Sequence, residues 1–358
     1  MTSTHAFRSE QVDLQVDERA VDEVSWEFAR RQWSDGLPIV PPTPERVEAM
    51  LDGVADSQRV VGVLDGRLGE ATLEVIAVNA VMAGCRPEHF PVVVAAVDAV
   101  CQPDFNLGSV QATTHPVAPL VIVNGPVRNQ IDMNHEAGCL GSGNLANATI
   151  GRALRLTMLN VGGGVAGQAD RATHGHPGKF SYCMAEHEEA NPWSPLHVDL
   201  GYAADESTVT VVPGEAPHNI NNHVGTTAAH VLTTCADSLC TLGTNNPFSI
   251  KKTEIWLILG PEHASTVAGD GWTKDDVRQF VYDRARLSVR RLKAAGGMWG
   301  MHSWPAWFQG VDDEDLVPVM ASPDRLGIVV AGGEGKHSVC VPSNGGSRSV
   351  TVPITFDL

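Results

Sequence analysis

Short apolar runs that stop at glycine or proline recur along the chain, and this pattern predicts buried strands that end in turns. The most marked run, residues 120–123, ends at the Asn-Gly-Pro of residues 124–126. Three similar runs follow in the second half, at residues 209–212, 255–259 and 326–330. Helical patterns separate these runs. The sequence therefore predicts an α/β protein with repeated strand–glycine-rich loop–helix units around a mixed or parallel sheet.

Apolar residues spaced three or four positions apart predict the helices. They cover residues 18–33, 43–51, 70–84, 88–101, 148–159, 226–239 and 274–287. At residues 84–87, Gly-Cys-Arg-Pro, glycine ends one helix and proline starts the next, which predicts a buried helical hairpin near the N-terminus. Asn147 is the predicted N-cap of the helix that follows the central loop. A further strand is predicted at residues 59–64.

Three regions are expected along the chain. Residues 1–17 are predicted to form a disordered arm, residues 18–118 an N-terminal helical and α/β region, and residues 119–358 an α/β core, with the last two separate or one continuous domain. The polar stretch 165–192 is long for a connection inside a compact domain, so we expect it to be functional or mobile. Its acidic run at residues 186–189 is predicted as a solvated helix start.

Composition narrows the range of partners. The chain has 358 residues, of which 43% are hydrophobic and 19% charged, as in ordinary globular proteins. A formal net charge of -17 argues against nucleic acid or an anionic membrane as a partner, since both bind basic surfaces. The chain contains no apolar run of 18 residues that would span a bilayer. Seven scattered cysteines and a polar N-terminus predict reduced thiols in the cytoplasm.

The first candidate site is the glycine-rich loop 138–144, which joins the 120–123 strand to its helix and carries Cys139. Free N–H groups at a helix N-terminus hold anions, and the positive end of the helix lowers the pKa of a nearby thiol. We therefore expect Cys139 to be a nucleophile or redox thiol, although a tight connection with a buried cysteine is the open alternative. The predicted substrate-binding residues are Gly141, Ser142, Gly143, Asn144, Lys336 and His115.

The second candidate site rests on a repeated motif after the later strands. Gly-Glu-x-x-His occurs at residues 214–218 and 333–337, and Gly-Pro-Glu-His at residues 260–263 is a shorter version. If the strands are parallel neighbours, His218, His263 and His337 converge beyond their carboxyl ends, where open α/β sheets bind ligands. Neutral imidazoles suit general-base catalysis or a divalent metal such as Zn or Fe. Antiparallel strands, or chance recurrence of short motifs, are the open alternatives.

Several segments resemble a bacterial, often actinobacterial, family of hypothetical proteins. They are DGLPIVPPT, NAVMAGC, TTHPVAPLVIVNGP, ANATIGRALRL, GPEHA and GGEGKHS, and together they lie within residues 35–354. Relatives accompany small proteins with a (seleno)Cys-Gly-Ser-Cys motif, so the resemblance implies thiol or redox chemistry shared between two subunits. This chain has Cys-Leu-Gly-Ser-Gly at residues 139–143 in place of that motif. The resemblance implies no particular reaction.

These observations give one main functional hypothesis and two alternatives. The main hypothesis is a cytoplasmic, homo-oligomeric enzyme that cleaves a bond in a small anionic molecule as a hydrolase or lyase. One alternative is a subunit of a two-component thiol/redox enzyme that docks a small Cys-rich partner through its glycine loops and the aromatic stretch 298–308. The other alternative is a small-ligand binding protein.

Overall fold

The computed structural model describes residues 20–66, 68–248, 253–296 and 312–358. Two predicted features, the N-terminal arm 1–17 and the aromatic stretch 298–308, lie outside these residues. Within the described segments, the mixture of helices and strands confirms the α/β class. None of the helices in these segments has the length and apolar character needed to span a bilayer.

The described strands form two four-stranded sheets and two short antiparallel pairs. The first sheet has the order β12 (Val350–Pro353), β5 (Thr208–Gly214), β3 (Ala118–Asn124) and β4 (Cys183–Ala185). The second sheet has the order β10 (Leu326–Val330), β7 (Ile255–Leu259), β11 (His337–Pro342) and β6 (His218–Asn221). The short pairs are β1 (Val60–Leu64) with β2 (Gly69–Thr72), and β8 (Arg286–Ser288) with β9 (Leu316–Pro318).

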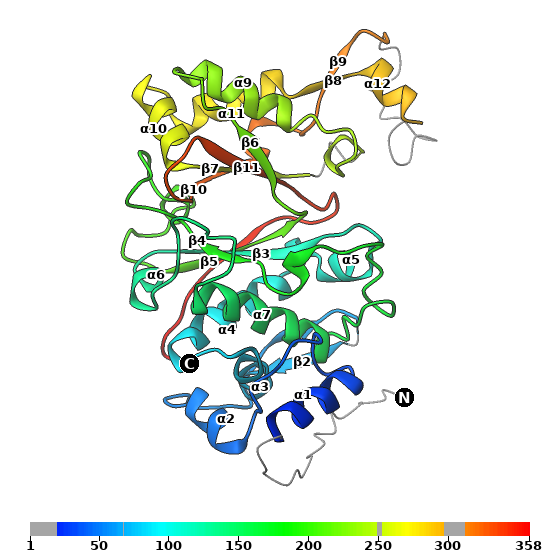
Figure 1. The fold of residues 1–358 in the computed structure, drawn as a ribbon, viewed down its shortest axis with the longest axis vertical. Coiled ribbons are helices and arrows are strands. Elements are labelled where there is room, and N and C mark those ends of the chain that lie inside the picture. The colour runs from blue at the N-terminus through cyan, green and yellow to red at the C-terminus, as the bar shows by residue number, and fades with distance from the viewer. Residues whose placement is uncertain (1–19, 67, 249–252, 297–311) are drawn as a thin grey trace.

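The two sheets lie face to face between two layers of helices (Figure 1). The helices on the side of the first sheet are α3 (Leu73–Ala83), α4 (Phe90–Cys101) and α7 (Leu145–Asn160). The helices on the side of the second sheet are α9 (Ala228–Ser238), α10 (Pro261–Gly269) and α11 (Lys274–Arg284). The other helices are α1 (Ala20–Arg30), α2 (Pro44–Met50), α5 (Leu107–Ala112), α6 (Val127–Gln130), α8 (Leu196–Asp199) and α12 (Val289–Ala294).

Alternation along the strands explains this layering. In β3, Leu120 and Ile122 pack into the core between the sheets, whereas Val121 and Val123 pack against the helices. In β7, Trp256 and Ile258 enter the same intersheet core, and the residues between them face the second helical layer. Successive side chains of a strand point to opposite faces. The central strands β3 and β7 are therefore apolar on both faces, because each lies between a layer of helices and the other sheet.

The expectation of one sheet is corrected to two mixed sheets. β3 is parallel to β4 and antiparallel to β5. β7 is parallel to β10 and antiparallel to β11. A continuous apolar run is typical of a strand buried on both faces, and it looks the same whether the cover is a helix or a second sheet. The sequence pattern therefore left the number of sheets undetermined.

The predicted helical hairpin is confirmed as α3 and α4. Gly84 ends α3 in the left-handed conformation with φ 90°, and the chain enters α4 through a short 3-10 turn that starts at Pro87. The predicted start of the first helix is wrong by three residues, because β2 extends to Thr72 and the Thr72 side chain then caps α3. The strand predicted at 59–64 is confirmed as β1.

The core does not divide at the predicted boundary between residues 118 and 119. One hydrophobic cluster joins α3 and α4 from the N-terminal region with α7 and with strand residues such as Val121 and Val352 from the later region. Figure 1 shows these elements packed as adjacent layers. One hydrophobic cluster therefore crosses the predicted boundary, and a second lies wholly within the later region.

Candidate metal centre

Loops from both sheets meet beyond the carboxyl ends of β3, β4 and β10. The backbone N–H of Glu186, just after β4, donates to the Val123 carbonyl oxygen at 3.1 Å. The N–H of His187 donates to the carbonyl oxygen of Val330, the last residue of β10, at 2.7 Å. The N–H of Gly332 donates to the His135 carbonyl oxygen at 2.9 Å. These bonds place the loop after β3 and the loop after β4 beside the end of the second sheet.

His135, Glu136 and His187 form a cluster of possible metal ligands at this meeting point. One ligand atom from each lies within 4.8 Å of the others. The His187 Nε2 atom is 4.0 Å from Glu136 Oε1, and the two imidazole ring centres are 4.7 Å apart. Both histidine side chains are 16% exposed, whereas Glu136 is 67% exposed. The two imidazole rings are therefore largely enclosed by protein, whereas the Glu136 carboxylate faces solvent.

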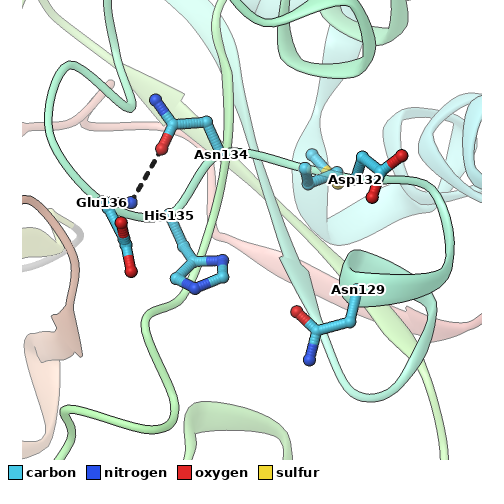
Figure 2. A pocket seen from close by; sticks show the side chains of 6 residues that line it. Asn129, Asp132, Asn134, His135 and Glu136 are labelled. Carbon is cyan, nitrogen blue, oxygen red and sulfur yellow. Dashed lines mark hydrogen bonds between the residues drawn. The ribbon is translucent and has the colours of Figure 1, made fainter.

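An open pocket of about 280 Å³ lies next to this cluster. Its lining residues are Asn129, Asp132, Met133, Asn134, His135 and Glu136. Figure 2 shows the side chains of His135 and Asn129 directed toward the open space between them. The lining offers imidazole, amide and carboxylate groups, and it includes neither lysine nor arginine.

The surroundings of the two imidazoles leave ring nitrogens available to a metal. His187 Nδ1 is 3.4 Å from the carbonyl oxygen of Gly332, to which only a protonated nitrogen donates, so Nε2 keeps its lone pair. His135 Nδ1 is buried and has no hydrogen-bond partner among the described residues. Burial lowers the pKa of His135, and the neighbouring His187 and Arg128 lower it further. A neutral imidazole is the form that binds metals.

A side chain of α7 holds the loop that carries His135 and Glu136. Asn147 donates from Nδ2 to the carbonyl oxygens of Asn134 and Cys139, at 2.7 and 3.0 Å. Its Oδ1 accepts from the Asn134 N–H at 3.0 Å. The Asn134 side chain in turn accepts from the Glu136 N–H at 2.9 Å (Figure 2). The prediction that Asn147 caps α7 is therefore wrong, because Asn144 is the N-cap and accepts from the Asn147 N–H.

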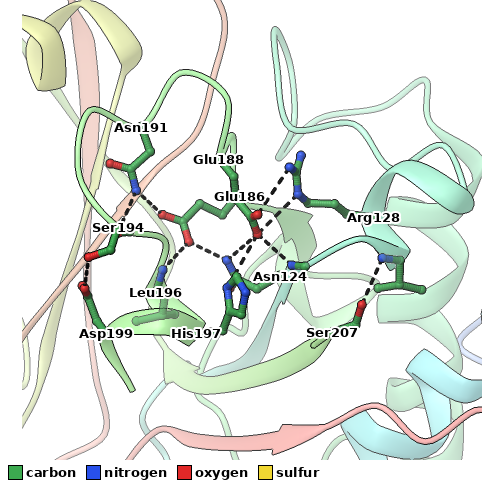
Figure 3. A network of polar contacts seen from close by, with 12 residues as sticks. Asn124, Arg128, Glu186, Glu188, Asn191, Ser194, Leu196, His197, Asp199 and Ser207 are labelled. Carbon is green, nitrogen blue, oxygen red and sulfur yellow. Dashed lines mark hydrogen bonds and ion pairs between the residues drawn. The ribbon is translucent and has the colours of Figure 1, made fainter. Parts of the chain in front are cut away.

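A network of ion pairs adjoins the cluster through Glu189, and Figure 3 shows its part around Arg128 and Glu188. Arg128 is 4% exposed, donates to both carboxylate oxygens of Glu189 at 2.6 and 2.8 Å, and lies 3.3 Å from Glu188 Oε1. Arg128 holds the pKa of Glu189 down to about 2. The Glu189 carboxylate also lies 3.8 Å from His135 Nε2, so the network reaches the proposed ligand.

The turn after β3 is shaped to receive Glu188. The Gly125 N–H donates to Glu188 Oε1 at 2.7 Å, and Asn124 Nδ2 donates to the same oxygen at 3.0 Å. Gly125 has a φ of 83°, and a Cβ there would collide with the backbone of Glu206. A side chain at position 125 would therefore displace the turn that binds Glu188.

Glu186 and His197 complete the buried part of the network (Figure 3). The fully buried Glu186 carboxylate accepts from Asn124, Asn191 and the Leu196 N–H, and burial raises its pKa. His197 Nδ1 is 3.8 Å from Glu188 Oε1, and neither ring nitrogen has a hydrogen-bond partner among the described residues. The acidic run 186–189 was predicted to be a solvated helix start. This is wrong because the run ends in a turn, with Glu186 and Glu188 folded inward onto Asn124 and only Glu189, paired with Arg128, exposed.

The glycine-rich loop takes its predicted place before α7, but its thiol is not in the predicted surroundings. Cys139 is 7% exposed and belongs to the core between the sheets. Burial raises its pKa, which contradicts the predicted lowering. Asn144, a predicted substrate ligand, instead caps α7 and donates to the Asp132 carbonyl oxygen. The other predicted contacts of this loop, Gly141, Ser142 and Gly143, are exposed.

The three strand-end histidines do not meet as predicted. β5, which precedes His218, lies in a different sheet from β7 and β10. His218 is exposed, pairs with Cys340 in the β6–β11 ladder, and is three pairs away from the His337 end of that ladder. His263 is 1% exposed and uses both ring nitrogens, on Ser338 at 2.8 Å and the Asn222 carbonyl oxygen at 3.2 Å. In the described part of the chain, the only three-residue group of possible metal ligands is that of His135.

His115 and Lys336 also lie away from a shared anion site. His115 Nε2 is 2.7 Å from Glu215 Oε1, at the start of β3. His115 thus lies before the start of β3, whereas the metal-ligand cluster lies beyond its carboxyl end. Lys336 is half-buried in the loop before His337, where its carbonyl oxygen accepts from the Asn222 N–H.

One signal in the sequence could have located the centre. His135 follows the first apolar strand, and His187 follows residues 183–185, which form β4 parallel to β3. Loops that follow the carboxyl ends of two neighbouring parallel strands lie close together. However, β4 has only three residues, which is too short an apolar stretch to be recognised as a strand in the sequence. No protein-family model and no curated protein sequence matches the chain. The geometry of the site therefore carries the functional argument.

Proposed function

We propose that this chain is a divalent-metal-dependent enzyme that cleaves a bond in a small polar molecule. The observation that carries the proposal is the convergence of His135, Glu136 and His187 within 4.8 Å beside an open pocket. Two imidazoles and one carboxylate form a ligand set of catalytic zinc sites and of non-haem Fe(II) sites. In this proposal the catalytic metal is bound by His135, Glu136 and His187, and not by the strand-end histidines that the sequence pattern favoured.

The spacing of the ligands fits a site that closes around its ion. Nitrogen and oxygen ligands that bind one zinc ion at about 2.0–2.2 Å lie about 3.3 Å apart in a tetrahedron. The 4.0 Å between His187 Nε2 and Glu136 Oε1 must therefore shrink by about 0.7 Å. Glu136 is mostly exposed and free to move, whereas the histidines are held by the Gly332 carbonyl group and by packing. The carboxylate is thus the ligand that adjusts.

The arrangement supports hydrolysis or elimination. Three protein ligands leave coordination positions open, and a bound metal supplies an activated water and polarises a substrate oxygen. The amides of Asn129 and Asn134 in the pocket lining are already hydrogen-bonded to Glu189 and to the loop backbone, so in this proposal the metal supplies the main contact to the substrate. Since the pocket lining has no lysine or arginine, an anionic substrate would bind through the metal.

Elemental analysis of purified, tag-free protein tests the proposal. We expect about one equivalent of Zn, Fe or Mn in the wild type, and its loss from a His135→Ala/His187→Ala double variant. His218→Ala is the matched control, because His218 is exposed and lies outside the cluster. The metal-loaded wild type is then screened against ester, amide and phosphoester substrates. Equal metal content in the double variant, or none in wild type after each metal is added back, rejects the proposal.

A further inference from the structure

We infer a second metal site on the exposed side of the second sheet, formed by His223 and His337. Their Nε2 atoms are 3.1 Å apart, and the rings meet edge to face at 77° with centres separated by 4.9 Å. Two imidazole nitrogens bound to one ion at about 2.0–2.1 Å lie about 3.3 Å apart. The pair therefore already has the spacing of two ligands on one metal.

A neighbouring amide sets the tautomer of His337. Its Nδ1 lies 2.9 Å from the Asn219 side-chain oxygen, which accepts but does not donate. The proton of the neutral ring is therefore on Nδ1, and the Nε2 lone pair points at His223. Histidines that bind metals commonly donate their other ring N–H to a protein oxygen in this way.

A strand carries His337, and a hydrogen-bonded turn after β6 carries His223. His337 begins β11 and pairs with Asn221 of β6. Asn222, directly before His223, is 9% exposed, and its side chain donates to the His230 carbonyl oxygen at 3.0 Å and to Thr234 at 2.9 Å. Its side-chain oxygen also accepts from the Gly225 N–H at 2.7 Å. The chain on either side of His223 is thus fixed, which favours a preformed pair over a chance approach of mobile rings.

The chemistry of the pair defines the ligand class. Imidazole pairs bind borderline divalent ions such as Zn²⁺, Ni²⁺ and Cu²⁺. Both rings are exposed, so water completes the coordination. The competing explanation is a hydrogen bond in which His223 Nε2–H donates to His337, with no metal involved. The two explanations differ in whether added metal binds here.

Metal titration in the His135→Ala/His187→Ala background isolates this site from the first one. Zn²⁺ and Ni²⁺ are titrated against a chromophoric chelator, and we expect one ion per chain. Binding should disappear in a further His223→Ala or His337→Gln variant and weaken about 10-fold in Asn219→Ala, the usual cost of losing such a supporting hydrogen bond. His218→Ala, an exposed histidine of the same sheet, should leave binding unchanged.

Two outcomes overturn the inference: no binding in the background variant, or binding that survives both histidine substitutions. Thermal unfolding confirms that each variant is folded. The same comparison is made in the wild-type chain, where loss of the second site lowers the metal capacity by one ion. Because the background lacks the first site, failure here leaves the proposed function standing, and failure of the proposed function leaves this site standing.

Discussion

The two histidine pairs lie at strand ends, but their surroundings differ. His135 and His187 are mostly buried, face the carboxylates of Glu136 and Glu189, and have an ion-pair network behind them. His223 and His337 are exposed, and the group that orients His337 is an amide. Nearby carboxylates compensate the charge of a bound ion, and restricted water strengthens its interactions. We therefore expect the first site to retain metal through purification and the second to bind only supplied metal.

The largest effect is expected when the network behind the first pair is broken. Arg128→Met leaves Glu188 half-buried without its cation, and breaking a buried ion pair commonly costs about 3–5 kcal/mol. Denaturant unfolding should show a loss of this order, accompanied by weaker metal binding at the first pair and unchanged binding at the second. Arg290→Met is the control, because Arg290 and Glu314 are both exposed and such a pair contributes less than about 1 kcal/mol. Equal effects of the two variants would show that the network does not support the site.

A smaller effect on the free energy of unfolding is expected from a change in pH. It involves buried histidines near both histidine pairs. Burial lowers the pKa of four histidines, which are His89, His135, His176 and His263. The unfolded chain takes up these protons first, near the ordinary value of 6.5, so the free energy of unfolding should fall as pH falls below about 6.5. Urea unfolding at pH 8, 7, 6 and 5.5 measures this dependence.

His263 offers a way to separate the regions in that experiment. His263 lies behind the second pair, where it bridges Ser338 and Asn222, the neighbours of His337 and His223. His263→Gln keeps hydrogen-bonding capacity and removes one titrating group, so its stability should depend less on pH than that of the wild type. His218→Ala should retain the wild-type dependence. A wild-type stability that is flat between pH 8 and 5.5 would contradict the burial of these neutral rings.

Local patterns in the sequence predicted the elements but not their assembly. The β3 run, the α3–α4 hairpin and the two strands β7 and β10 follow from periodicity and from glycine and proline positions. Two sheets instead of one could not be inferred, because apolar residues on both faces of β3 suit either partner. The stretch 165–192 carries His187 of the proposed site, but the expectation that it is functional or mobile stays a prediction.

Long-range polar contacts explain the errors at the sites. Asparagine is a residue type that commonly caps helices, which is why Asn147 was predicted as a cap. Its side chain instead donates to the carbonyl oxygens of Asn134 and Cys139 in the preceding loop. His263 follows a strand as predicted, but burial against Ser338 makes it structural. His337 was a predicted ligand whose partner, His223, has no place in the repeated motif. The expected cytoplasmic location, homo-oligomer and small Cys-rich partner stay predictions.

The smallest effect is expected at Cys139, the residue that the sequence pattern placed at the centre of the chemistry. Its sulfur is buried between the sheets, and its raised pKa leaves little of the reactive thiolate at neutral pH. Iodoacetamide should therefore modify Cys139 in the folded protein far more slowly than after unfolding, as measured by peptide mass spectrometry. Cys139→Ala should lower the free energy of unfolding by only about 1 kcal/mol and leave metal content unchanged.

The opposite result would change the comparison between the two histidine pairs. Cys139 lies only three residues after Glu136, and its carbonyl oxygen accepts from Asn147, which also holds Asn134. Rapid alkylation that also releases metal from the first pair would mean that this loop opens in solution and that a thiol belongs to the metal centre. The pair of His135 and His187 would then be the mobile one, and the exposed pair of His223 and His337 the rigid one. Slow alkylation with metal retained keeps the thiol in the core and the chemistry with His135, Glu136 and His187.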